Sequence, residues 1–219
     1  MTRLYAEQHR MLQDKFDTRR MADRLEELAC KTFLDEGDKA FIEAADMFFL
    51  ATTDDCSRPT VSYKGGDPGS VKVAAANSLS FPIYDGNGMF LSAGNVSANP
   101  NVGMLFISFE RPHRLRLQGT ASISQDAEVL AEHPGADLVV SVTLTDVFPN
   151  CPRYVHRYQK VSGSRYVPQS GCEAPIAEWK RIDIVQDALP ARDVARVERA
   201  RLIGAEEWLQ RVKSGDPNA

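Results

Sequence analysis

The chain has 219 residues, of which 43% are hydrophobic and 26% charged, a composition typical of a folded globular protein. Its 26 basic and 30 acidic residues give a net charge of −4, which argues against general nucleic-acid binding, because neutralising phosphates requires excess positive charge. Residues 1–23 lack the apolar stretch of a secretory signal, and no apolar run reaches the ~20 residues that span a bilayer, so we expect a cytoplasmic protein without membrane contact.

Residues 1–46 predict a helical segment that packs on a sheet or on a partner subunit. Charged and polar residues separate apolar ones at roughly helical spacing, namely Leu4, Met11, Leu12, Phe16, Met21, Leu25 and Leu28. Asp38 is the expected N-cap of a second, short helix that carries Phe41 and Ile42.

Residues 47–165 predict a β domain. Residues 47–53 and 60–63 flank the turn 54–59 and indicate a hairpin. Further strands are expected at 70–74, 79–82, 102–109, 115–124 and 138–148, and one helix from about 89 to 99, ended by Pro100. Such short strands with few helices between them indicate a mostly β fold, a small antiparallel barrel. Residues 166–219 predict a C-terminal extension that is helical from Pro190.

One loop has the composition of an anion site. Residues 81–96 join a strand to the short helix and are rich in Gly, Asn and Asp, so backbone N–H groups and the positive helix terminus can surround an anion. Asn87, Ser92 and Asn95 add neutral hydrogen-bond donors, and Lys72 on the preceding strand adds positive charge. The alternative is a plain turn that uses glycine where φ is positive.

Two other segments are candidates for binding. Arg114 and Arg116 share the polar face of an alternating strand, where the alternative is a solvated surface. Residues 150–157 contain Cys151, and if this cysteine were a nucleophile, His113 or His156 would be its general base. A binding loop that uses Arg153 and Tyr154 is the favoured interpretation of the segment. The spacing of the four cysteines predicts free thiols and no metal site.

Several motifs in chain order resemble the flavin-binding split-barrel family related to pyridoxamine 5'-phosphate oxidase, over about residues 40 to 160. They are Ser62-Tyr63-Lys64-Gly65-Gly66, Val71-Lys72-Val73, Phe81-Pro82-x-Tyr84-x-Gly86-Asn87-Gly88-Met89, Gly94-Asn95-x-x-x-Asn99-Pro100-x-Val102 and Leu117-Gln118-Gly119-Thr120-Ala121. The chain departs from the oxidase itself where that enzyme carries a Ser-Arg-Lys run, because Phe90-Leu91-Ser92 stands here. The oxidase's C-terminal signature has no clear counterpart.

The resemblance implies a six-stranded antiparallel split barrel, flanked here by N- and C-terminal helices. It also implies a homodimer that binds FMN in a cleft at the dimer interface. By this analogy the strand with Val71 and Val73 runs along the flavin ring, and the partner's strand with Arg114 and Arg116 contributes a polar residue. The remaining cofactor contacts would come from Lys64, Lys72, Tyr84, Asn87, Gly88, Ser92 and Asn95.

The first hypothesis for function is an FMN-dependent oxidoreductase that transfers hydride or electrons between a reduced nicotinamide and a small acceptor. Hydride transfer to a flavin needs no side-chain acid or base, which agrees with the lack of a catalytic motif in the sequence. The second is a non-catalytic protein of the same fold that holds a flavin, a deazaflavin or a haem, with His113, His133 or His156 as haem ligands. The third is an interaction module whose barrel has lost its cofactor.

Overall fold

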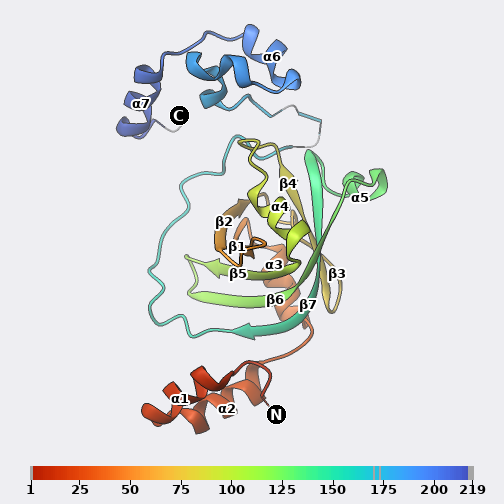
Figure 1. Ribbon diagram of the computed structural model, residues 1–219, viewed down its shortest axis with the longest axis vertical. Helices are drawn as coiled ribbons and strands as arrows, with labels where there is room; N and C mark the ends of the chain where they lie inside the picture. Colours follow the sequence, from red (N-terminus) through yellow and green to blue (C-terminus); the bar gives the residue numbers. More distant parts are fainter. Residues whose placement is uncertain (1, 170, 173, 217–219) are drawn as a thin grey trace. The chain divides into compact units, whose positions relative to one another are not determined.

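The computed structural model describes residues 2–169, 171–172 and 174–216, and the chain forms two compact units, Met1–Gly163 and Ser164–Ala219 (Figure 1). The N-terminal helices, expected as a separate segment, belong to the same unit as the strands. The first unit contains α1 (Glu7–Lys15), α2 (Arg19–Ala29), α3 (Glu36–Glu43), β1 (Met47–Thr53), β2 (Pro59–Gly65), β3 (Lys72–Ala75), β4 (Ser78–Tyr84), α4 (Leu91–Ala98), β5 (Asn101–Ser108), β6 (His113–Ser124), α5 (Ala127–Ala131) and β7 (Ala136–Pro149).

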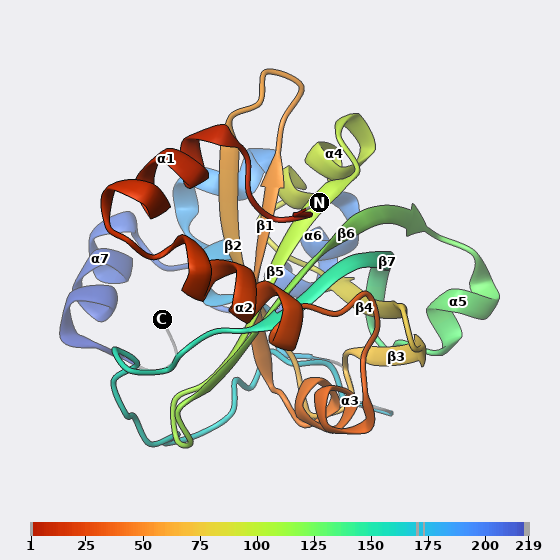
Figure 2. The same cartoon turned by 90° about the horizontal axis from the view of Figure 1, so that it is seen from below.

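The seven strands of the first unit form one antiparallel sheet in the order β2-β1-β5-β6-β7-β4-β3. The two edge strands, β2 and β3, are not paired with each other, which confirms the split barrel. The sheet has one strand more than the six expected. Helix α4 packs against β1 and β6 (Figures 1 and 2).

Two details differ from the sequence-based expectations. Helix α3 is capped by Asp35, whose side chain accepts the backbone N–H of Asp38 at 2.9 Å, so Asp38 is the N3 partner of a capping box and not the N-cap. The strand region also contains a second helix, α5, where only one was expected. With five residues α5 is too short to give a periodic hydrophobic signal.

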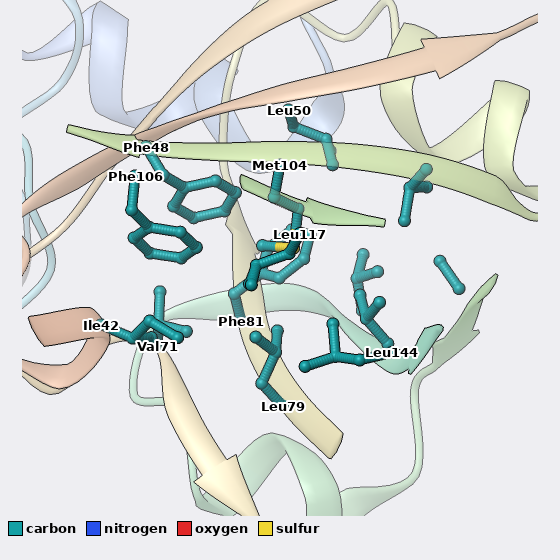
Figure 3. Close-up of a cluster of buried hydrophobic side chains, with 14 of the residues drawn as sticks. Ile42, Phe48, Leu50, Val71, Leu79, Phe81, Met104, Phe106, Leu117 and Leu144 are labelled. Carbon is teal, nitrogen blue, oxygen red and sulfur yellow. The ribbon is translucent and has the colours of Figure 1, made fainter. Parts of the chain in front are cut away.

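The core lies inside the curved sheet. The ring of Phe48 stacks on Phe106 at 4.9 Å between centroids and meets Phe81 edge to face at 5.0 Å (Figure 3). Every second residue of β1 and β6 is buried there, including Leu50 and Leu117, as the alternation predicted. Because each strand buries one face in this way, the register of the sheet is fixed.

A glycine allows β6 and β7 to approach closely where the ladder changes register. A Cβ atom on Gly119 would lie 2.3 Å from the carbonyl oxygen of Thr143, so only glycine fits between these strands. The register of the β6–β7 ladder shifts by a bulge between Gln118 and Gly119, at this same position.

The N-terminal helices are joined to the barrel at β7. The guanidinium of Arg3 contacts Asp146 and donates to the carbonyl oxygen of Thr145 at 2.8 Å. Lys31 forms a backbone bridge with Val147.

The second unit contains η1 (Glu178–Arg181), η2 (Asp183–Ala188), α6 (Ala191–Glu198) and α7 (Ala205–Ser214). Helix α6 begins directly after Pro190, as expected. The interior of the second unit holds an ion pair in which Lys180 Nζ lies 2.8 Å from Asp193 Oδ2, and both side chains are almost fully buried.

Candidate functional site

An anion-binding arrangement forms where β2 faces the start of α4. Helix α4 begins after Phe90, and no side chain caps its first N–H groups. The N-terminus of a helix carries a partial positive charge and free N–H donors, so it favours a negative ligand. Ser92, in the first turn of α4, is buried and points its hydroxyl toward β2, where Oγ lies 3.0 Å from Ser62 Oγ.

Lys64 places a cation beside this helix terminus. Its Nζ donates to Ser92 Oγ at 3.1 Å, and among the described residues no carboxylate forms an ion pair with it. Burial lowers the pKa of Lys64 below its usual value, because the charged form loses hydration. A half-buried cation without a counter-charge is stabilised by a bound anion, and phosphate is the anion that suits a lysine, serine hydroxyls and a helix N-terminus together.

The alternation of β2 explains why these groups meet. Thr60, Ser62 and Lys64 lie on one face of the strand and line a cavity of about 290 Å³. Val61 and Tyr63 lie on the other face and are 67% and 62% exposed. Since β2 is an edge strand, its neighbour on one side is β1 and its other edge is open.

The loop before α4 forms the second wall of the cavity. Asn87 Oδ1 accepts the backbone N–H of Met89 at 3.1 Å, and Gly88 has a φ of 76°, a conformation suited to glycine. Phe90 also has a positive φ, 49°, which strains a non-glycine residue and commonly marks a functional turn. Tyr84 at the end of β4 completes the wall, and burial raises the pKa of its hydroxyl.

Five of the residues expected from the sequence line this one cavity: Lys64, Tyr84, Asn87, Gly88 and Ser92. Sequence reasoning missed Thr60 and Ser62. The signal that could have found them is the period of two, which places positions 60, 62 and 64 on one face of a strand.

The structure does not bring Lys72 into this cavity. Lys72 starts β3 and pairs with Ser80, whose Oγ lies 2.9 Å from His133 Nε2. The ring of His133 is 3% exposed, and its pKa is lowered first by burial and then by the charge of Lys72. The two residues that flank Lys72 in the chain also lie outside the cavity: Val71 is a buried core residue, and Val73 packs against the core.

Asn95, Arg114 and Arg116 also lie away from the cavity. Asn95 is buried in α4 and donates to Thr52 Oγ1 at 3.0 Å, a contact that joins the helix to β1. Arg114 is half-buried on β6 and donates to the carbonyl oxygen of Cys151 at 2.6 Å, and Arg116 is exposed on the same face. Neither arginine lines the Lys64 cavity.

Comparison with known proteins places this geometry in context. Residues 34–141 match the sequence profile of the pyridoxamine 5'-phosphate oxidase family. No curated protein sequence gives a significant match. In the part of the chain that the structure describes, no helix has the length and apolar character needed to cross a membrane.

Three solved structures show partial similarity to this chain. A putative pyridoxamine 5'-phosphate oxidase from Lactobacillus delbrueckii is 24% identical, over 54% of this chain and 95% of that one, with a TM-score of 0.44. An FMN-binding protein from Syntrophomonas wolfei is 9% identical, over 64% and 97%, with a TM-score of 0.41. The haem storage protein HutZ from Vibrio cholerae is 20% identical, over 52% and 89%, with a TM-score of 0.37.

Proposed function

We propose that the chain is a member of the family related to pyridoxamine 5'-phosphate oxidase, whose profile its residues 34–141 match, that it binds FMN through the Lys64 cavity, and that it acts as an FMN-dependent oxidoreductase. The observation that carries the proposal is the half-buried Lys64, which has Ser92 at 3.1 Å but no carboxylate partner in the described chain. We propose that it works in the cytoplasm as a homodimer on a small-molecule substrate.

The residues of the cavity fit the phosphate end of FMN. Lys64 supplies the charge, Ser62 and Ser92 supply hydroxyl donors, and the first turn of α4 supplies backbone N–H groups. The cavity of about 290 Å³ is at the lower end of the usual range for small-molecule sites, ~300–1,000 Å³. It therefore suits the phosphate and its polyol chain, while the flavin ring needs a further wall.

A second copy of the chain is the proposed source of that wall. Exposed apolar side chains lie at the cavity mouth, namely Met89, Phe90 and Leu91, and an apolar rim of this kind is typical of a surface that becomes covered. In the dimer the partner's Arg114 or Arg116 is proposed to reach the flavin.

FMN, when bound, supplies a ring that accepts hydride from a reduced nicotinamide and passes electrons on. The chain's own residues bind and orient it: Lys64 and the start of α4 hold the phosphate, and the apolar rim excludes water from the ring. No side chain of the cavity is required to transfer a proton for this chemistry.

The test is the absorption spectrum of the purified protein, followed by release and chromatography of the chromophore. We expect a yellow protein that yields FMN at about one per subunit. Lys64→Met should abolish FMN retention, and Lys72→Met is the matched control, because Lys72 is a strand lysine outside the cavity. A colourless protein that does not take up added FMN, or equal loss of FMN in both variants, would refute the assignment.

The alternative is a non-catalytic binding protein for a flavin, a deazaflavin or a haem. The same spectrum separates these ligands, because a haem gives a strong Soret band. Of the candidate haem ligands, His133 is buried and bonded to Ser80, whereas His113 packs edge to face against Phe41 and His156 is exposed. A flavin-bound protein that oxidises no nicotinamide with any tested acceptor would favour the non-catalytic role.

A further inference from the structure

A second and larger cavity includes Tyr63, which lies on the face of β2 opposite to Lys64. Its volume is about 750 Å³, within the usual range for a small-molecule site. The start of β1, the end of α3 and the β5–β6 turn line it, together with residues 158–160 and Ser162. Its walls carry the aromatic rings of Phe41, Tyr63, Phe109 and Tyr158 and the imidazole of His113.

The segment that closes this cavity is anchored at both ends. Asn150 N–H donates to the carbonyl oxygen of Arg114 at 3.2 Å, where the segment leaves β7. Tyr158 N–H donates to the carbonyl oxygen of Phe109 at 3.1 Å, and the two rings meet edge to face at 5.4 Å. Lys160 Nζ lies 2.5 Å from Asp46 Oδ2, so the charges of Lys160 and Asp46 neutralise each other.

Arg111, in the wall of this cavity, belongs to a group of arginines without a counter-charge. Between positions 2 and 163, all of which are described, Arg111, Arg114, Arg116, Arg153 and Arg157 form no ion pair, whereas each of the other arginines there contacts a carboxylate. The unpaired arginines come from two segments, 110–116 and 150–157, whose only acid is Glu110. These segments therefore carry a charge of about +4 in a chain of net charge −4.

The position of these arginines relative to the cavity follows from the contacts. Arg111 lines the cavity, and Arg114 pairs across the ladder with Ile107, which also lines it. Arg157 directly precedes Tyr158 of the cavity wall, and Arg153 lies between the two anchors of the segment. Glu110 also lines the cavity and accepts the backbone N–H of Lys160 at 3.3 Å.

We infer that this cavity binds a nucleotide-type ligand, a planar heteroaromatic base joined to two or more phosphate groups. The aromatic walls suit the base, because stacking on aromatic side chains is favourable for any planar ring. The arginines suit the phosphates, because a guanidinium matches a phosphate with two parallel hydrogen bonds. Arg111 and Arg157 contact the phosphates, and Arg114 positions the segment through its bond to the carbonyl oxygen of Cys151.

A small ligand is favoured over a nucleic acid by the shape of the site. Arg111 lines one hollow of defined volume, the other unpaired arginines come from two short segments, and the chain as a whole is acidic. A nucleic-acid surface would need positive charge spread over a longer track. The inference does not depend on FMN binding, because this cavity shares no residue with the Lys64 cavity.

Isothermal titration calorimetry on the full chain tests the inference with NADP⁺, inorganic pyrophosphate and adenosine as probes. We expect NADP⁺ to bind more tightly than either fragment. Arg111→Gln and Arg157→Gln should each weaken NADP⁺ and pyrophosphate by about tenfold. Tyr158→Ala should weaken NADP⁺ by about tenfold and leave pyrophosphate unchanged, because it removes only the stacking surface.

The matched control is Arg199→Gln, because Arg199 is an exposed arginine of the second unit that forms no ion pair with any described acid, and the change should leave all affinities unchanged. Equal affinity of the wild type and the Arg111 and Arg157 variants for NADP⁺ would overturn the inference. So would the absence of binding, or tighter binding of a single-stranded oligonucleotide than of NADP⁺. FMN content is measured on the same samples, so a failure of the nucleotide inference can be told apart from a failure of the flavin proposal.

Discussion

The Nζ atom of Lys64 lies 3.1 Å from Oγ of Ser92, although the two residues are 28 positions apart and belong to an edge strand and a helix. The contact joins a cation on β2 to the first turn of α4 and forms the most electropositive part of the cavity. Nothing acidic in the described chain neutralises it. A buried cation in this position lowers the stability of the free protein and favours an anionic ligand.

Lys64→Met should therefore make the flavin-free protein more stable, not less. Burial lowers the pKa of Lys64 in the folded state, so the unfolded chain binds the proton more tightly. The stability linked to this group is complete above pH ~10.5 and is lost as the pH falls through the folded pKa. We expect a gain of about 1 kcal/mol for Lys64→Met at pH 7, after the loss of its hydrogen bond to Ser92.

Urea unfolding of the flavin-free protein at pH 7 and pH 10 measures this effect. The wild type should become more stable relative to Lys64→Met as the pH rises. A variant that is less stable than the wild type at pH 7 would show that Lys64 already has a counter-charge in the free protein.

Protonation of His133 should destabilise the first unit in mild acid. Its pKa is lowered by burial and then by the charge of Lys72, so the folded state prefers the neutral ring. The stability linked to this histidine is complete above pH ~6.5 and is lost as the pH falls toward the folded pKa. The free energy of unfolding should therefore decrease between pH 7.5 and pH 5.

Urea unfolding of the wild type and of His133→Gln at these two pH values tests this expectation. Glutamine keeps a hydrogen-bond partner for Ser80 but does not titrate, so its pH dependence should be smaller. The same slope in both proteins would assign the acid sensitivity to other groups.

Gly119→Ala should destabilise the sheet by about 3 kcal/mol, because the new methyl group would collide with the carbonyl oxygen of Thr143 at 2.3 Å. That oxygen belongs to a backbone that is paired on both sides, so it cannot move freely. Gly103→Ala is the matched control, since its added atom would meet only Ala51 Cβ at 3.7 Å. Thermal unfolding of the two variants should differ clearly, and equal midpoints would contradict the close approach of β6 and β7.

Asp193→Asn should destabilise the second unit, because it removes the negative charge beside the buried Lys180. Breaking a buried ion pair on one side typically costs about 3–5 kcal/mol. The measurement is limited proteolysis, which should cleave residues 164–216 faster in the variant. Glu207→Gln is the control, because the pairs of Glu207 with Arg201 and Arg211 lie at the surface, and its cleavage rate should stay close to wild type.

Much of the fold could be predicted from alternation and turn residues. β6 and β7 bury every second residue along much of their length, and a period of two in the sequence marks such strands directly. The start of α6 after Pro190 could also be predicted from the sequence. The N-cap of α3 was not, because Asp35 and Asp38 are the same residue type three positions apart, and only the backbone geometry shows which one precedes the helix.

The sequence by itself determined that the chain carries a small antiparallel barrel and that its Gly- and Asn-rich loop before α4 could surround an anion. Local spacing is enough for this, because strand alternation and turn chemistry act over a few residues. Only the tertiary structure decided which lysine meets that loop. Lys64 and Lys72 both lie on short strands, but β2 faces α4 while β3 pairs with β4 and approaches His133. That choice depends on how the sheet curves, which is set by packing between residues far apart in the chain.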